Sequence, residues 1–98
     1  IFLVKNNKFK ISIIGLGKLG SPMLAIFAEK GFKVIGVDLN SKIVDSINSG
    51  IAPFNEPLLQ DLLTNNKGNY SATTKINEAV ENATSREIWV ISLPVASF

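Results

Sequence analysis

Three glycines and one acidic residue are spaced so that together they could bind a ligand. Gly15, Gly17 and Gly20 follow the apolar run 11–14 in the pattern G-x-G-x-x-G, and Asp38 lies eighteen positions after Gly20. Such glycines permit a tight turn, leave room for a diphosphate beside the backbone and let a helix pack closely on a sheet. A carboxylate about 20 residues further on can accept a hydrogen bond from a ribose hydroxyl. The pattern therefore predicts a dinucleotide site.

The charge of Asp38 predicts which dinucleotide binds. A carboxylate there would repel the 2′-phosphate of NADP, so NAD is the expected cofactor. The N–H groups from about Lys18 onward carry partial positive charge and are expected to face the phosphates. An acid after a strand is also a common turn former or helix cap, and this structural explanation of Asp38 stays open.

Strands and helices must alternate to position these residues. Apolar runs rich in β-branched residues predict strands at 9–14, 33–37, 70–73 and 87–93. Helices are predicted at 18–30, from a cap at Asn40 or Ser41 to Gly50, from Pro57 to the polar turn 65–69, and at 74–83 with Thr74 as a cap.

Apolar spacing also predicts which helix faces are buried. In the first helix, one stripe is formed by Leu19, Met23, Ile26 and Phe27, and Met23 and Phe27 are expected to pack in the core. Gly31 is expected to end this helix in a left-handed conformation. In the third helix Pro57 is expected at the first position, and the inward residues are Leu58, Leu59, Leu62 and Leu63.

The alternation predicts an α/β fold, a Rossmann-type doubly wound parallel sheet with about four strands in the order 3-2-1-4. Residues 1–98 are expected to form one dinucleotide-binding domain, with residues 1–8 left unassigned. A full domain of this type has about six strands, and an apolar fourth strand at the sheet edge would invite aggregation. We therefore expect an incomplete domain.

Composition excludes several classes of function. The chain of 98 residues is 46% hydrophobic and 18% charged, as in globular proteins, and its net charge of +2 is too small to indicate nucleic-acid binding. The chain lacks cysteine and histidine, so neither a disulfide nor a transition-metal site is expected. Neither a membrane span nor a signal peptide is expected, and a cytoplasmic location is the prediction.

Further segments resemble one family, the nucleotide-sugar 6-dehydrogenases (UDP-glucose/GDP-mannose dehydrogenases), over residues 10–94. The segments that carry the resemblance are 37–40 (VDLN), 44–50 (VDSINSG), 53–59 (PFNEPLL), 72–74 (ATT) and 78–80 (EAV). The resemblance implies that this chain is the NAD-binding part of an enzyme that oxidises the C6 alcohol of a UDP- or GDP-sugar to a carboxylate, for polysaccharide biosynthesis. It also implies a homo-oligomeric full-length protein.

The resemblance assigns roles to individual residues. It implies that the pyrophosphate is held by Gly15, Leu16, Gly17, Lys18, Leu19 and Gly20. It implies that Asp38 binds the adenosine ribose and that Leu93 and Pro94 border the cofactor. Lys42 lies one place before the family's usual basic residue, which contacts the adenosine end. The family's catalytic cysteine, lysine and asparagine are implied to lie in a carboxyl-terminal part that also binds the nucleotide sugar, so no catalytic residue is assigned here.

Some residues depart from the family pattern, and alternatives stay open. Lys75 stands where the family often has aspartate, and Val95 and Ala96 replace its usual Thr-Pro. One alternative is a β-hydroxyacid or 6-phosphogluconate-type dehydrogenase, which shares the glycine-rich opening. A second is a nucleotide-sensing regulatory module without catalysis.

Overall fold

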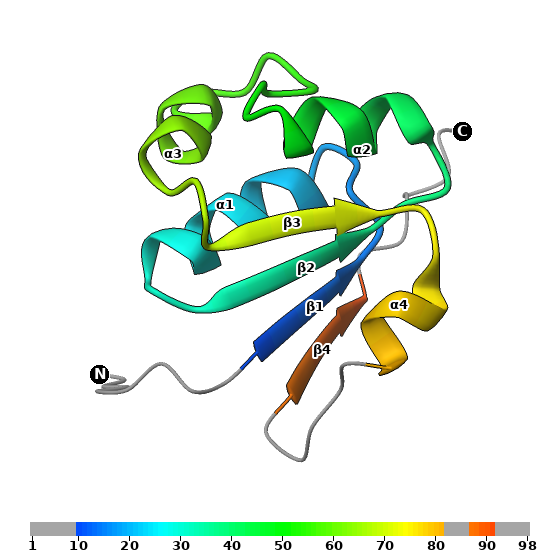
Figure 1. Ribbon diagram of the computed structural model, residues 1–98. Coiled ribbons are helices and arrows are strands. Elements are labelled where there is room, and N and C mark those ends of the chain that lie inside the picture. Colours follow the sequence, from blue (N-terminus) through cyan, green and yellow to red (C-terminus); the bar gives the residue numbers. More distant parts are fainter. Residues whose placement is uncertain (1–9, 82–86, 92–98) are drawn as a thin grey trace.

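The computed structural model describes residues 10–81 and 87–91, and in these residues strands and helices alternate (Figure 1). The strands are β1 (Lys10–Ile14), β2 (Lys33–Val37), β3 (Tyr70–Thr73) and β4 (Glu87–Ile91). The helices are α1 (Gly20–Glu29), α2 (Ser41–Asn48), α3 (Leu59–Asn65) and α4 (Ile76–Glu81). The alternation predicted from the sequence is confirmed.

The four strands form one parallel sheet in the order β3-β2-β1-β4, as predicted. Ile13 of β1 lies opposite Gly36 of β2 and Val90 of β4, so β1 is flanked on both sides. The chain moves from β1 outward to β3 and then returns to the far side of β1. In open α/β sheets, ligands bind at the carboxyl ends of the strands where the winding reverses in this way.

Helices cover both faces of the sheet. In Figure 1, α1 lies behind the strands and α4 in front of them. The core on the α1 side joins the sheet to α1, α2 and α3, and its fully buried large members include Ile11, Ile13, Leu24, Ile47 and Leu63. Transfer of such side chains out of water contributes about 1.5–3 kcal/mol each to folding. The doubly wound architecture is therefore confirmed.

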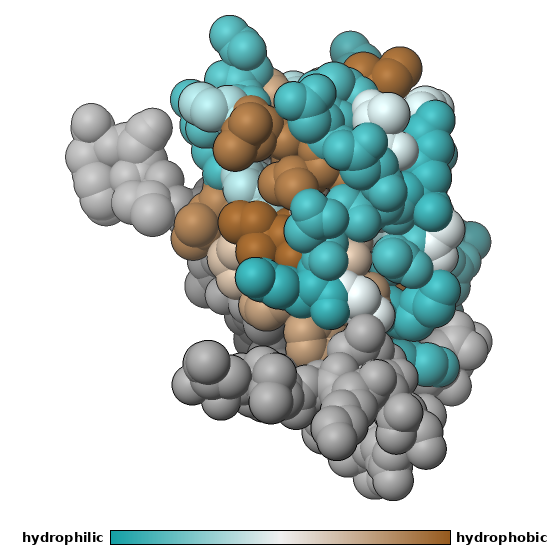
Figure 2. Space-filling view, turned by 90° about the vertical axis from the view of Figure 1, so that its left-hand side faces the viewer, coloured by the Kyte–Doolittle hydropathy of each residue, from teal (hydrophilic) through white to brown (hydrophobic). Residues whose placement is uncertain are grey.

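The predicted apolar stripe of α1 is wrong. Leu19 and Ile26 are 61% and 47% exposed, and the buried face is formed by Gly20, Ser21, Leu24, Ala25 and Ala28. Met23 and Phe27 do pack against the core, although they remain partly exposed. Small residues on the buried face let the helix lie close to the sheet. Figure 2 shows an apolar area on the side of the molecule where α1 and α3 lie.

The ends of α1 and α2 follow local chemistry. Gly31 has φ 93°, a conformation that costs glycine least, and it follows the end of α1 as predicted. Asn40, rather than Ser41, caps α2, because its side-chain oxygen accepts from the N–H groups of Lys42 (2.9 Å) and Ile43 (3.4 Å). The helix α1 begins at Gly20 and not at Lys18, since residues 18 and 19 form the turn before it.

The predicted start of α3 is also wrong. Helix α3 begins at Leu59 rather than Pro57, and Leu58 has φ 68° and is 70% exposed. Gln60 holds this end to the preceding loop, because its amide accepts from Ala52 N–H (2.8 Å) and donates to the Gly50 carbonyl (2.8 Å). The left-handed conformation of Leu58 turns the chain, so that Leu59 faces the core and Leu58 itself faces solvent.

On the outer edge of β3, a side chain forms hydrogen bonds with the backbone groups of Ala72. Asn48 of α2 donates to the carbonyl of Ala72 (2.9 Å) and accepts from its N–H (2.8 Å), as a neighbouring strand would. At the end of β3, the Thr73 hydroxyl accepts from Lys75 N–H (3.1 Å) and donates to Glu78, so the expected capping role of Thr74 is taken by Thr73. Covering an edge in this way limits pairing with other chains.

Some sequence-based predictions lie outside the described residues. These are Phe9 as the start of the first strand, residues 82–83 of the last helix and residues 92–93 of the last strand. Within residues 10–81 and 87–91, every helix is too short to cross a bilayer.

Candidate functional site

The glycine-rich turn lies at the carboxyl end of β1, where the winding of the sheet reverses. Gly15 has φ 99°, which explains why glycine is needed at this position. Its N–H donates to the carbonyl of Val37 at the end of β2 (2.7 Å). The turn is thereby tied to the neighbouring strand before α1 begins.

Four consecutive N–H groups follow at the start of α1. In the described part of the chain, no protein atom accepts a hydrogen bond from the N–H groups of residues 17–20. The next donor, Ser21 N–H, bonds to the carbonyl of Gly17 (3.0 Å) and closes the first turn. A Cβ built on Gly17 would have no atom within 4 Å, so the space there is open. Unpaired N–H groups at a helix start are suited to bind an anion.

Asp38 reaches from the end of β2 to the glycine-rich turn. One of its carboxylate oxygens accepts from Leu16 N–H (2.8 Å), and the other accepts from Asn40 N–H (2.8 Å). The structural role considered for Asp38, that of a turn former, is thus present. The side chain is half-buried, and each carboxylate oxygen has a further lone pair that could accept from a ligand hydroxyl. Asp38 and the glycine-rich turn are therefore in direct contact.

Gly36, which the sequence patterns did not single out as a site residue, makes room for the turn. The side chain of Leu16 is fully buried, and a Cβ on Gly36 would lie 2.6 Å from Leu16 Cδ2 and 2.8 Å from Leu24 Cδ1. A glycine inside a strand is a known sign that another group approaches closely. That sign was available in the sequence, although it could not identify Leu16 as the group.

Substitution of Gly36 tests this packing. Gly36→Ala is expected to lower the free energy of unfolding by about 1–3 kcal/mol, because Leu16 and Leu24 are fully buried and cannot move aside cheaply. Urea unfolding measures the change. Gly17→Ala is the matched control and should leave stability nearly unchanged, since its Cβ meets open space. Equal stability of Gly36→Ala and the unsubstituted protein would contradict the packing argument.

The remaining predicted site residues are Lys18, Leu19, Gly20, Lys42, Leu93 and Pro94. The side chains of Lys18 and Leu19 are exposed beside the turn, whereas Gly20 is buried as the first residue of α1. Lys42 is exposed in the first turn of α2. Leu93 and Pro94 lie outside the described residues, so their predicted position beside the cofactor stays a prediction.

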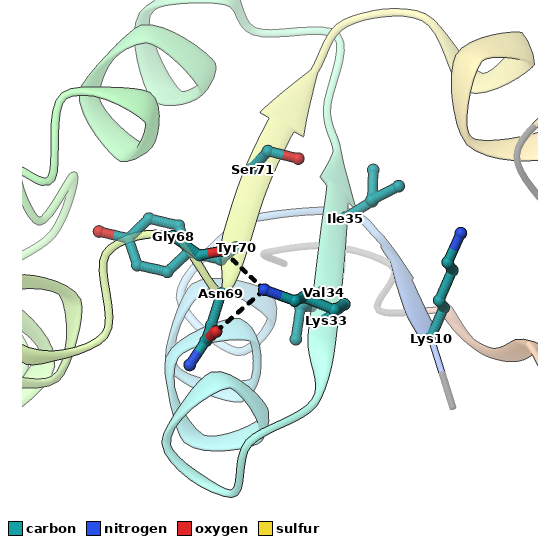
Figure 3. A pocket seen from close by; sticks show the side chains of 8 residues that line it. All are labelled: Lys10, Lys33, Val34, Ile35, Gly68, Asn69, Tyr70 and Ser71. Atoms are coloured by element: carbon teal, nitrogen blue, oxygen red, sulfur yellow. Dashed lines mark hydrogen bonds between the residues drawn. The ribbon is translucent and has the colours of Figure 1, made fainter. Parts of the chain in front are cut away.

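A pocket of about 230 Å³ lies at the opposite, amino-terminal end of the strands (Figure 3). Lys33 points across it, and its ammonium donates to the carbonyl of Gly68 (3.1 Å) and to Asn69 Oδ1 (3.3 Å). Burial raises the pKa of the nearby Tyr70 hydroxyl above its ordinary value of 10.0, and this hydroxyl donates to the carbonyl of Leu63 (2.8 Å). These contacts join β2 and β3 to the turn before β3 and do not involve the glycine-rich site.

Comparison with known families gives one match that spans most of the chain. Residues 9–96 match the model of the NAD binding domain of the UDP-glucose/GDP-mannose dehydrogenase family. NAD is therefore the cofactor that this kind of domain binds. The match includes the glycine-rich turn, Asp38 and the segment with Leu93 and Pro94.

Individual relatives act on different sugars. The chain is 49% identical over 77 residues to UDP-N-acetyl-D-mannosamine dehydrogenase of Campylobacter jejuni, covering 74% of this chain and 19% of the relative. It is 41% identical over 73 residues to UDP-glucose 6-dehydrogenase of Haloferax volcanii, covering 74% and 17%. The crystal structure of a ternary complex of GDP-mannose dehydrogenase from Pseudomonas aeruginosa matches with a TM-score of 0.81 and 36% identity, covering 90% of this chain and 20% of that one. The chain thus spans about a fifth of the length of these proteins.

Proposed function

We propose, because this chain belongs to the UDP-glucose/GDP-mannose dehydrogenase family, that residues 1–98 are the NAD-binding part of a nucleotide-sugar 6-dehydrogenase. The full-length enzyme oxidises the C6 alcohol of a UDP- or GDP-sugar to a carboxylate. NAD supplies the hydride acceptor for this chemistry when it is bound. The residues of this chain bind and orient the cofactor, and the catalytic residues belong to other parts of the protein.

The unpaired N–H groups of residues 17–20 are the observation that carries the proposal. They lie together at the start of α1, the position of a Cβ on Gly17 beside them is open, and no described protein group competes for them. A diphosphate offers the acceptors and the negative charge that such a site favours. The residues that hold the pyrophosphate in this proposal are Gly15, Leu16, Gly17, Lys18, Leu19 and Gly20.

Other residues contact the two ends of the cofactor. Asp38 accepts a hydrogen bond from a hydroxyl of the adenosine ribose, since its carboxylate lies beside the same turn. Lys42 lies near the adenosine end, and Leu93 with Pro94 borders the nicotinamide side. The proposal includes a homo-oligomeric full-length enzyme in the cytoplasm that provides oxidised sugars for polysaccharide biosynthesis.

Titration with the two cofactors tests the role of Asp38. NAD is expected to bind the full-length protein at least about fivefold more tightly than NADP, because a carboxylate about 4 Å from a phosphate costs roughly 1 kcal/mol or more. Isothermal calorimetry with each cofactor measures the two affinities. Tighter binding of NADP would reject the proposed role of Asp38.

A reaction assay is the companion measurement. The full-length protein with NAD and UDP-glucose, UDP-N-acetylmannosamine or GDP-mannose is expected to form NADH with one of these sugars. Two NADH per sugar are expected, because oxidation of an alcohol to a carboxylate takes up one water and transfers two hydrides, one to each of two NAD molecules. Binding of NAD without NADH formation from any of the sugars would favour the nucleotide-sensing alternative.

A further inference from the structure

Both backbone groups of Leu16 are held by side chains from other elements. Its N–H donates to Asp38 (2.8 Å), and its carbonyl accepts from the hydroxyl of Ser21 (2.5 Å). Its side chain is fully buried over Gly36. The residue in the middle of the glycine-rich turn is therefore held in position from three directions before any ligand arrives.

Ser21 controls the part of the turn that faces the ligand. The carbonyl of Leu16 and the N–H of Gly17 belong to one planar trans peptide, so the two groups point in opposite directions. By holding the carbonyl, Ser21 directs the N–H of Gly17 away from the helix interior, where no described protein atom accepts its proton. The orientation of a ligand-facing donor thus depends on a hydroxyl four residues away.

We propose that Ser21 is a positioning residue for the diphosphate of the dinucleotide, an inference that rests on the function proposed above. Ser21 is 0% exposed, so it cannot contact the ligand itself and acts through the Leu16–Gly17 peptide. Without the hydroxyl, the Leu16 carbonyl loses its donor in a buried place, and the peptide gains freedom to rotate. The N–H of Gly17 is then no longer preorganised for a phosphate oxygen.

The test compares two serine-to-alanine variants of the full-length protein. Ser21→Ala removes the hydrogen bond to Leu16. Ser46→Ala is the matched control, because the Ser46 hydroxyl also donates to a carbonyl five residues away, that of Ile51 (2.6 Å), far from the site in sequence. Calorimetry at a temperature at which both variants are folded is expected to show about tenfold weaker NAD binding for Ser21→Ala. Ser46→Ala should bind NAD as the unsubstituted protein does.

Binding of a second ligand, adenosine, distinguishes a positioning role of Ser21 from a purely structural one. Adenosine has the ribose that Asp38 would contact but no phosphate, so its affinity, measured by NMR titration, should be unchanged in Ser21→Ala. Unchanged NAD affinity, or equal weakening of NAD and adenosine, would overturn the inference. Ser21→Cys, which keeps the size and a weaker donor, should bind NAD with intermediate affinity, and an affinity equal to that of the unsubstituted protein would also count against the inference. Failure of the unsubstituted protein to bind NAD would instead refute the proposed function.

Discussion

Gly17→Val is expected to fold normally and to lose at least about 100-fold in NAD affinity, or roughly 2.7 kcal/mol. The backbone at Gly17 is outside the left-handed region, and an added Cβ meets no atom within 4 Å, so the fold accepts the side chain. The same side chain occupies open space at the turn whose N–H groups, those of residues 17–20, have no described protein acceptor. A diphosphate would then lose several charge-assisted hydrogen bonds at once.

Calorimetry measures the affinity of Gly17→Val, and circular dichroism confirms that it folds. Gly17→Ala provides a graded comparison, because its smaller side chain should cause a smaller loss of affinity at unchanged stability. A folded Gly17→Val variant with the NAD affinity of the unsubstituted protein would show that the diphosphate does not lie at this turn.

Asp38→Asn is expected to weaken both the fold and the binding of NAD. Both carboxylate oxygens accept from backbone N–H groups, those of Leu16 and Asn40. An asparagine offers only one acceptor oxygen, so one N–H must face the NH₂ group. The substitution removes a charged acceptor and leaves one backbone N–H without a partner. Together these changes should lower the free energy of unfolding by about 1–3 kcal/mol even without ligand. Binding of NAD should fall at least about tenfold, since the turn and the ribose lose the same acceptor.

Urea unfolding and calorimetry measure these two effects separately. Asp45→Asn makes the same chemical change on the exposed side of α2 and should alter stability by less than about 0.5 kcal/mol. Asp38→Asn should also discriminate less against NADP, because it removes the charge that repels a 2′-phosphate. If Asp38→Asn were as stable as Asp45→Asn, the two hydrogen bonds of Asp38 would have no role in holding the turn.

Helix α1 shows where sequence reasoning reached its limit. The stripe with Leu19 and Ile26 and the stripe with Leu24 and Ala28 both fit a helical period. Periodicity indicates an amphipathic helix, but it does not show which stripe the sheet covers. Apolar size favoured the first stripe, whereas the close approach of helix and sheet required the small residues of the second. The inward position predicted for Leu58 is wrong for a related reason, because the hydrogen bonds of Gln60 to the preceding loop hold the start of α3.

The sequence by itself determined the order of strands and helices, the parallel sheet, and the meeting of the glycine-rich turn with Asp38. These follow from local patterns and from one topological rule, that parallel strands bring their carboxyl ends to the same edge. Only the tertiary structure decided that Ser21 and Gly36 hold Leu16 in place. Such contacts depend on the distance between a helix and a sheet, and that distance results from the packing of side chains far apart in the chain.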